Sequence, residues 1–330
     1  MCKRALSAGK IYGYKLESLF SKREKLDSSL VGNSAAILTA FLWTGSSILF
    51  TSAGKRLGFF SINAYRSAIS VGLLVIAHIV LLGYVLPVAS GEQWFWMGLS
   101  GIVGLGIGDL GLFAAYILIG PRQALLLMAS SPIFAAVSAY LMLGEIFPSL
   151  AILGVAITLL GIVIVVLEKE NHTQTPADGN NRKAWGTFAG IVAATGQGVG
   201  LVLSKKGMYV GESIAMNAVS AALIRMLIAT VFVWAAALLI GKASELRDTI
   251  GDRKGLKFIA GGAFIGPFVG MTLSLFAVAY TEAGIAQTLL SLEPLIIIPL
   301  MWKIYGEKTN KRGIIGAVLA VAGVTILMLS

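Results

Sequence analysis

The sequence predicts an all-α integral membrane protein of ten transmembrane helices, arranged as two inverted five-helix repeats. Three observations support this fold class: an apolar composition, ten long apolar stretches, and a pattern of glycine, proline and glutamate that occurs twice. Of the 330 residues, 57% are hydrophobic and 13% are charged, whereas soluble domains are about 45–50% apolar and about 25% charged. A chain with so little polar surface is expected to lie in a bilayer.

The ten predicted helices follow from the length that a bilayer requires. A helix needs about 20 mostly apolar residues to cross the hydrocarbon core. Cutting the chain at charged and turn-rich points leaves ten such stretches, at about 31–53, 61–84, 93–118, 121–143, 149–167, 185–204, 214–240, 256–280, 284–302 and 312–329.

A duplicated pattern relates the two sets of five helices. The segment SSPIFAAVSAYLMLGE at 130–145 corresponds to LEPLIIIPLMWKIYGE at 292–307, with proline, glycine and glutamate in the same relative places. At an offset of 162 residues, Pro132 matches Pro294, Gly144-Glu145 matches Gly306-Glu307, and Gly104 matches Gly266. A proline inside a helix removes one backbone hydrogen bond, so we expect helix kinks at Pro132 and Pro294.

The domain organisation follows from the odd number of helices in each repeat. Five crossings force the second repeat to enter the membrane from the opposite side, so the repeats are inverted. Secondary transporters often have this architecture, with the substrate site near the bilayer midplane between the repeats. The predicted units are a basic cytoplasmic tail, a first repeat, a polar linker and a second repeat, at 1–30, 31–167, 168–184 and 185–330.

Four charged residues fall within the predicted helices: Asp109, Glu293, Arg225 and Arg66. A charge at the bilayer centre costs at least about 2.5–3.5 kcal/mol and usually faces a cavity or a partner. Asp109 is either a structural carboxylate paired with an arginine or a residue of the pathway that carries protons. Glu293, beside Pro294, either faces a cavity or pairs with Arg225 or Arg66.

Neutral residues complete the predicted pathway for substrate and ions: Gln197, Gln287, Trp43 and Ser131. Ser131 occupies the position that Glu293 has in the second repeat, so the scaffold is symmetric while the chemistry is not. One cavity that receives one asymmetric substrate would explain that difference. The glycines around Asp109 are expected to permit close helix packing.

Several function classes are excluded by composition. One cysteine, Cys2, and two distant histidines argue against a metal site or a cofactor. The net charge of +10 is concentrated in the tail and loops, which suits anionic lipid headgroups rather than nucleic acid. The Gly106-Ile107-Gly108-Asp109 motif resembles that of intramembrane aspartyl proteases, but no second aspartate lies in a predicted helix, so we do not expect an enzyme.

Several segments resemble the EamA-type transporters of the drug/metabolite transporter superfamily: FLWTGSSILFTSAGKRLG followed by Arg66, GPRQALLLMASSPIFAAVSAYLMLGE, and AQTLLSLEPLIIIPLMWKIYGE. The resemblance implies ten helices around a central cavity, cytoplasmic termini, and export of amino acids, other metabolites or toxic compounds. The first helix reads Trp43-Thr44-Gly45-Ser46-Ser47 and lacks the asparagine that often occurs nearby in that family.

The predicted function is that of a secondary transporter in the inner or plasma membrane, which exports a small metabolite by alternating access with possible proton coupling. An ion channel or cation carrier, or a non-transporting receptor or scaffold on the same fold, is the alternative. Substrate, direction, coupling ion and oligomeric state are left open. Orientation is also open, because an N-terminus inside gives nine Lys and Arg on the cytoplasmic side and fifteen opposite, against the positive-inside rule.

Overall fold

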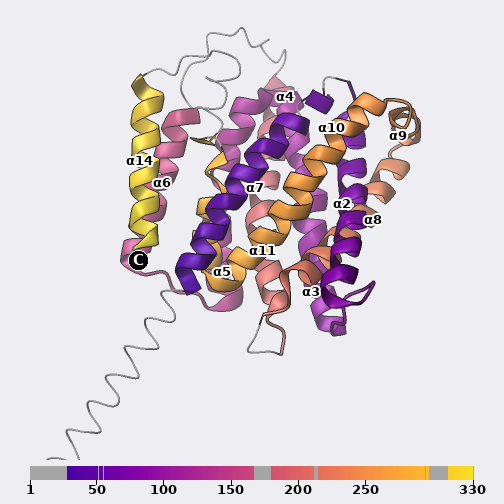
Figure 1. Ribbon diagram of the computed structural model, residues 1–330. Coiled ribbons are helices and arrows are strands. Elements are labelled where there is room, and N and C mark those ends of the chain that lie inside the picture. Colours follow the sequence, from indigo (N-terminus) through magenta and orange to yellow (C-terminus); the bar gives the residue numbers. More distant parts are fainter. Residues whose placement is uncertain are drawn as a thin grey trace, which may run out of the picture.

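The chain forms a bundle of helices in a computed structural model (Figure 1), which describes residues 28–50, 52–54, 56–166, 180–211, 215–293, 295–296 and 311–329. Over these residues every regular element is helical, as predicted. Six of the described helices are long and apolar enough to cross a membrane, and three shorter apolar helices accompany them. Residues 1–27 of the predicted tail, most of the linker, Pro294 and Gly306-Glu307 lie outside the described residues.

The first half of the chain contains the first helix (residues 28–50), α2 (Phe59–Leu82), α3 (Gly91–Ser100), the π-helical η1 (Gly101–Gly108), α4 (Asp109–Met128), α5 (Ser131–Leu143) and α6 (Ser149–Val166). Local signals fix several of these ends. Ser90 and Gln93 form a capping box at the start of α3, and Gly144 ends α5 with φ of +67°, a conformation that favours glycine.

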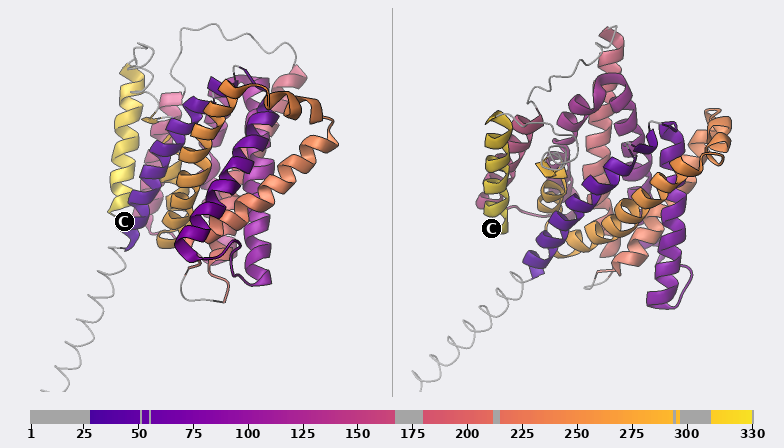
Figure 2. Two further views of the ribbon diagram at one scale, coloured as in Figure 1. Left: turned by 45° about the vertical axis from the view of Figure 1, so that its right-hand side comes forward. Right: turned by 45° about the horizontal axis from the view of Figure 1, so that its top comes forward.

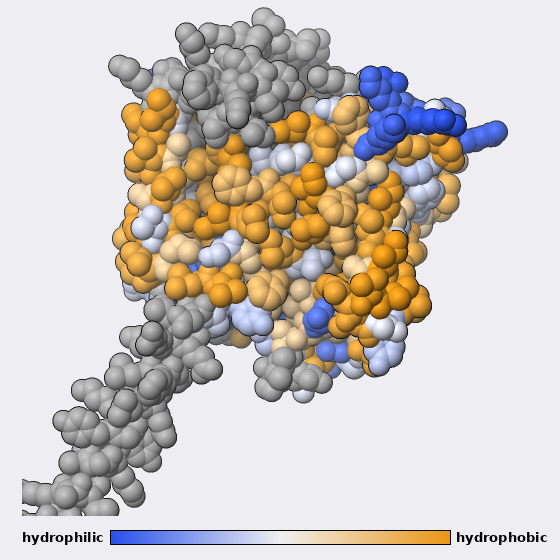
Figure 3. Space-filling view, viewed as in Figure 1, coloured by the Kyte–Doolittle hydropathy of each residue, from blue (hydrophilic) through white to orange (hydrophobic). Residues whose placement is uncertain are grey.

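The second half contains α7 (Asn180–Met208), α8 (Ala218–Leu239), the short α9 (Ala243–Thr249), α10 (Arg253–Ala263), the π-helical η2 (Phe264–Gly270), α11 (Met271–Tyr280), α12 (Ala283–Leu290) and α14 (Lys311–Met328). Figure 3 shows hydrophobic side chains over the middle of the molecule and hydrophilic ones at its upper edge, near α9 and the start of α10. We call this edge the upper face, and the opposite edge, where α5 and α14 end, the lower face (Figure 1).

The two π-helical segments occupy equivalent places in the two halves. Gly108 ends η1 and Gly270 ends η2, which is the offset of 162 residues found in the sequence. Glycine is a weak helix former, and Pro267 inside η2 cannot donate a backbone hydrogen bond, so an α-helix is poorly supported in both segments. Asp109 and Met271 therefore begin the next α-helix from the end of a widened turn.

The predicted break between the third and fourth crossings differs in the structure, because α4 continues through residues 118–121. Contacts with α7 show where the chain reverses. Gly104 lies against Gly200 near one end of α7, Ile119 lies against Gly186 near the other end, and Ser131 lies against Gly198, close to the first end again. The chain thus runs along α7 in one direction up to Ile119 and has turned back by Ser131.

Helices α6 and α14 pack closely at one edge of the bundle, and the two views in Figure 2 also place them side by side. A Cβ added at Gly161 would overlap the carbonyl of Gly316 and the backbone of Ala320, while Gly154 lies against Gly323. The glycines therefore form a packing surface between helices of the two halves.

Candidate functional site

A central cavity of about 830 Å³ lies between the two halves of the chain. Its walls come from the first helix, α2, η1 and α4 of the first half, and from α7, α8, η2, α11 and α12 of the second. Toward the upper face the cavity reaches the exposed Gly54 and Gly58, and its lining also includes the buried Gln287 and Leu290. Seven of the eight predicted pathway residues line it; the exception is Ser131.

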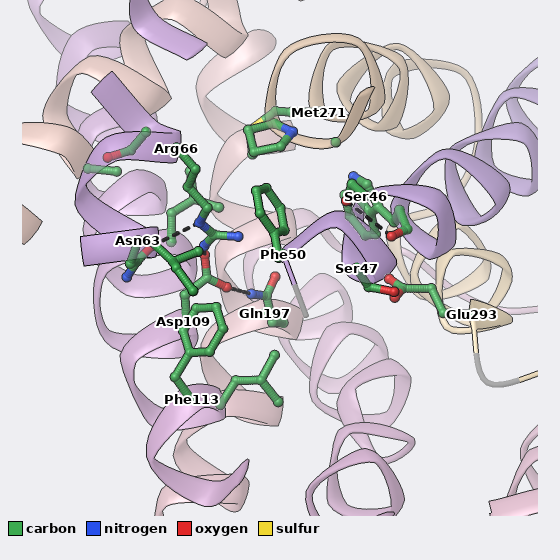
Figure 4. A pocket seen from close by; sticks show the side chains of 18 of the residues that line it. Ser46, Ser47, Phe50, Asn63, Arg66, Asp109, Phe113, Gln197, Met271 and Glu293 are labelled. Carbon is green, nitrogen blue, oxygen red and sulfur yellow. Dashed lines mark hydrogen bonds and ion pairs between the residues drawn. The ribbon is translucent and has the colours of Figure 1, made fainter. Parts of the chain in front are cut away.

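Asp109 is the centre of a buried polar cluster on one wall (Figure 4). Its Oδ2 atom forms an ion pair with the guanidinium of Arg66, and its Oδ1 atom accepts a hydrogen bond of 2.7 Å from Gln197 Nε2. The Nε–H of Arg66 donates to Asn63 Oδ1 at 3.0 Å. Asp109 thus has the arginine partner that the sequence left as one of two interpretations, and both its oxygens are engaged.

Aromatic rings flank the Arg66 guanidinium. Its Cζ atom lies 5.5 Å from the centre of the Phe50 ring and 5.4 Å from that of Phe113, within the range of cation–π attraction. Sequence reasoning missed both rings, and it missed Asn63 as well. The spacing of Asn63 could have identified it as a partner of Arg66, because a residue three positions before Arg66 lies on the same face of α2.

Arg225 reaches the same wall from α8 and is 3% exposed. Its Nη2 atom lies against Gly104, where an added Cβ would come within 2.7 Å of it, and its backbone carbonyl lies against Gly101. No residue in the described part of the chain forms a hydrogen bond with its Nε–H. The glycine stripe of η1 therefore does more than bring helices together, because it makes room for a guanidinium group.

Glu293 lies on the opposite side of the cavity. In the view of Figure 4 it appears apart from the Asp109 cluster, on the side where Ser46 and Ser47 are drawn. Within the described part of the chain, no hydrogen bond or ion pair of the Glu293 carboxylate is observed, so the predicted pairing with Arg225 or Arg66 is not found. The cavity therefore has a donor-rich wall and an acidic wall, separated by apolar side chains.

The remaining predicted residues occupy other parts of the site. Gln287 Nε2 donates to Ser131 Oγ at 3.0 Å, which holds Ser131 behind the cavity lining. The indole nitrogen of Trp43 lies against Gly270, at the end of η2. Pro132 does not kink a helix as predicted, since it sits in the first turn of α5 after a turn at residues 129–130, where the missing N–H has no helical partner to lose.

At the lower face, five residues that we call the lower-face cluster connect the two halves: Asn33, Glu145, Lys205, Thr281 and Ala283. Lys205 Nζ lies 2.7 Å from Glu145 Oε1 and donates to the carbonyl of Thr281 at 2.6 Å. Glu145 Oε2 accepts from the Ala283 N–H at 2.9 Å, and Asn33 Oδ1 accepts from Thr281 Oγ1 at 2.8 Å. The cavity is therefore closed by polar contacts below and approaches the surface above.

Comparison with known proteins supplies the decisive observation. The model of the EamA-like transporter family matches residues 30–167 and matches again at residues 184–329. The chain belongs to the EamA-like transporter family. It is accordingly a multi-pass membrane protein and a transporter of the drug/metabolite type, and the family is not one of enzymes.

The fold of this EamA-like transporter recurs in a solved structure whose title reads "Crystal structure of protein". The match has a TM-score of 0.68 at 19% sequence identity and covers 92% of this chain and 96% of that one. Comparison with curated proteins found no match. Both family matches contribute to the lining of the cavity of the EamA-like chain: Arg66 and Asp109 belong to the first, and Gln197, Arg225 and Glu293 to the second.

Proposed function

We propose that this chain is a ten-span secondary transporter that exports a small amino-acid-like or drug-like metabolite across the inner or plasma membrane by alternating access. The observation that carries the proposal is the cavity between the two halves, which reaches the upper face and is closed below by the lower-face cluster. A transporter that alternates between two access states has such an arrangement in one of them.

The count of ten spans is supported by the helices themselves. Six helices are long and apolar enough to cross a membrane. We count the three shorter apolar helices as further crossings and α12 as the start of a tenth. An even number of crossings leaves both termini on one side, which we assign to the cytoplasm. The cavity would then face outward in this state.

The two walls suit a substrate that carries charge at one end and has an apolar body. Arg225 and Asn63 offer hydrogen-bond donors, Glu293 offers a carboxylate, and rings such as Phe50 lie between them. A carboxylate without a partner can bind either a proton or a substrate cation, and alternation between the two would exchange protons for substrate. Glu293 is the residue that we assign to this exchange, with Asp109 holding the opposite wall in place.

The test is a flux assay in proteoliposomes with radiolabelled amino acids, with and without a pH gradient. We expect the gradient to accelerate flux, and Glu293→Gln to remove the acceleration while the control Glu92→Gln, outside the cavity, keeps it. Intact gradient-driven flux in both Glu293→Gln and Asp109→Asn would refute proton coupling through these carboxylates. Channel-sized currents independent of any gradient would favour the ion-channel alternative.

A further inference from the structure

The guanidinium group of Arg225 has hydrogen-bond donors for which the described residues provide no acceptor. Among the residues that the structure describes, no hydrogen bond or ion pair of its guanidinium is observed, and its Nε–H is buried without a partner. The nearest fixed anion on this wall, Asp109, already has both oxygens engaged by Arg66 and Gln197. A buried cation without a hydrogen-bonded partner is strongly unfavourable, so a group that enters the cavity is expected to complete it.

Asn63 provides a second unused donor beside the same cluster. The residue is 1% exposed and its Oδ1 atom accepts from Arg66. Its Nδ2 atom has no hydrogen-bond partner among the residues that the structure describes. Asn63 lies on α2 and Arg225 on α8, and the side chains of both line the cavity. Two buried donors of different helices therefore remain open on the wall where Arg66 is already satisfied.

The charges on this wall point to the type of ligand. Arg66 pairs with the one carboxylate of this wall, Asp109, and the guanidinium of Arg225 lies against Gly104 of the same wall. Glu293 lies apart from this cluster in Figure 4. We infer that Arg225 and Asn63 form a subsite for one carboxylate group of the transported molecule. A carboxylate supplies two oxygens and can accept from both residues at once. This inference rests on the proposed function, since it takes the cavity as the transport site.

The glycine of η1 sets the position of the subsite. Gly104 leaves the space in which Arg225 Nη2 lies, and a Cβ there would come within 2.7 Å of that atom. Gly104→Ala would thus displace the guanidinium without removing its charge. The variant separates a requirement for the position of Arg225 from a requirement for positive charge in the cavity.

The test measures equilibrium binding to the full-length protein in lipid nanodiscs. The probes are three acids and their neutral amides: acetate and acetamide, hexanoate and hexanamide, phenylacetate and phenylacetamide. Each pair shares one body, so the comparison isolates the carboxylate. We expect at least one acid to bind about ten times more tightly than its amide, because a charge-assisted hydrogen bond is roughly twice as strong as a neutral one.

Arg225→Met, Asn63→Leu and Gly104→Ala are each expected to reduce this preference to threefold or less, while the exposed Arg253→Gln keeps it. If Arg225→Met does not fold, Asn63→Leu and Gly104→Ala decide. Equal binding of acid and amide in all three pairs, or a preference unchanged in these variants, overturns the subsite. The measurement uses neither a gradient nor flux, so a negative binding result overturns the subsite without contradicting the proposed transport. Conversely, a preference for acids in a protein that shows no flux would support the subsite and contradict the proposed transport.

Discussion

The ammonium group of Lys205 lies 2.7 Å from the carboxylate of Glu145, and this ion pair joins the end of α7 to the turn that follows α5. Both side chains are largely buried, with exposures of 16% and 12%. The pair therefore holds the two halves of the transporter together at the lower face. Its rupture is a condition for opening the cavity on that side.

Breaking this ion pair should shift the protein toward a state open at the lower face. The neighbouring Ser204 is fully buried, so Ser204→Cys in a Cys2→Ser background reports on opening. We expect Glu145→Gln or Lys205→Met to raise the rate of maleimide labelling about tenfold, the change in population that about 1.4 kcal/mol produces. The conservative variant Lys205→Arg, which keeps a positively charged donor for Glu145 and for the Thr281 carbonyl, should keep labelling slow; equal rates in all variants would show that the pair does not hold this face closed.

Removing the carboxylate of Asp109 should destabilise the protein more than removing its whole ion pair. Asp109→Asn leaves Arg66 buried without its anion, and breaking such a pair costs about 3–5 kcal/mol. Thermal unfolding of purified protein should therefore show a lower midpoint for Asp109→Asn than for the double variant Asp109→Asn with Arg66→Gln. A double variant less stable than the single one would contradict this assignment.

The contact between α6 and α14 should tolerate no added methyl group at Gly161. Overpacking typically costs about 1–3 kcal/mol, so Gly161→Ala should lower the unfolding midpoint. Gly72→Ala is the matched control, because no atom lies within 4 Å of an added Cβ there and alanine is the better helix former. The prediction fails if the two variants are equally stable.

The turn after the first helix should respond to acid. Hydrogen bonds from Arg56 and then from the Gly255 N–H lower the pKa of the Asp252 carboxyl below its usual value. A depressed pKa in the folded state adds stability above the ordinary value of about 3.9, and this stability is lost as pH falls through the folded-state pKa. Asp252→Ala should thus unfold at a slightly lower temperature than wild type at pH 7, and this difference should shrink as pH falls below the ordinary pKa of the carboxyl group; a difference that stays constant over that range would argue for another cause.

The single native cysteine offers a direct test of orientation. If the N-terminus is cytoplasmic, an impermeant maleimide should label Cys2 only after cells are permeabilised. Labelling of intact cells would instead favour the orientation that the loop charges indicate under the positive-inside rule.

Residue patterns predicted the helical class and seven of the residues that line the cavity, because apolar length and rare intramembrane charges are strong local signals. They could not predict the partner of Asp109. The choice of Arg66 over Arg225 depends on how α2, α4 and α8 pack, which no spacing along the chain reveals. Pro132 was misread for a similar reason: a proline inside an apolar run looks the same whether it kinks a helix or begins one.

The paired π-helical segments also carry historical information. A π-turn contains one residue more than an α-turn needs, and η1 and η2 hold that residue at matching places in the two halves. Independent insertions at the same place would be a coincidence, whereas a single insertion in an ancestral half-length chain would be inherited by both copies. A shared origin of the two halves therefore accounts for the matching widened turns, and Asp109, which has Met271 as its counterpart, is a position at which the two halves now differ.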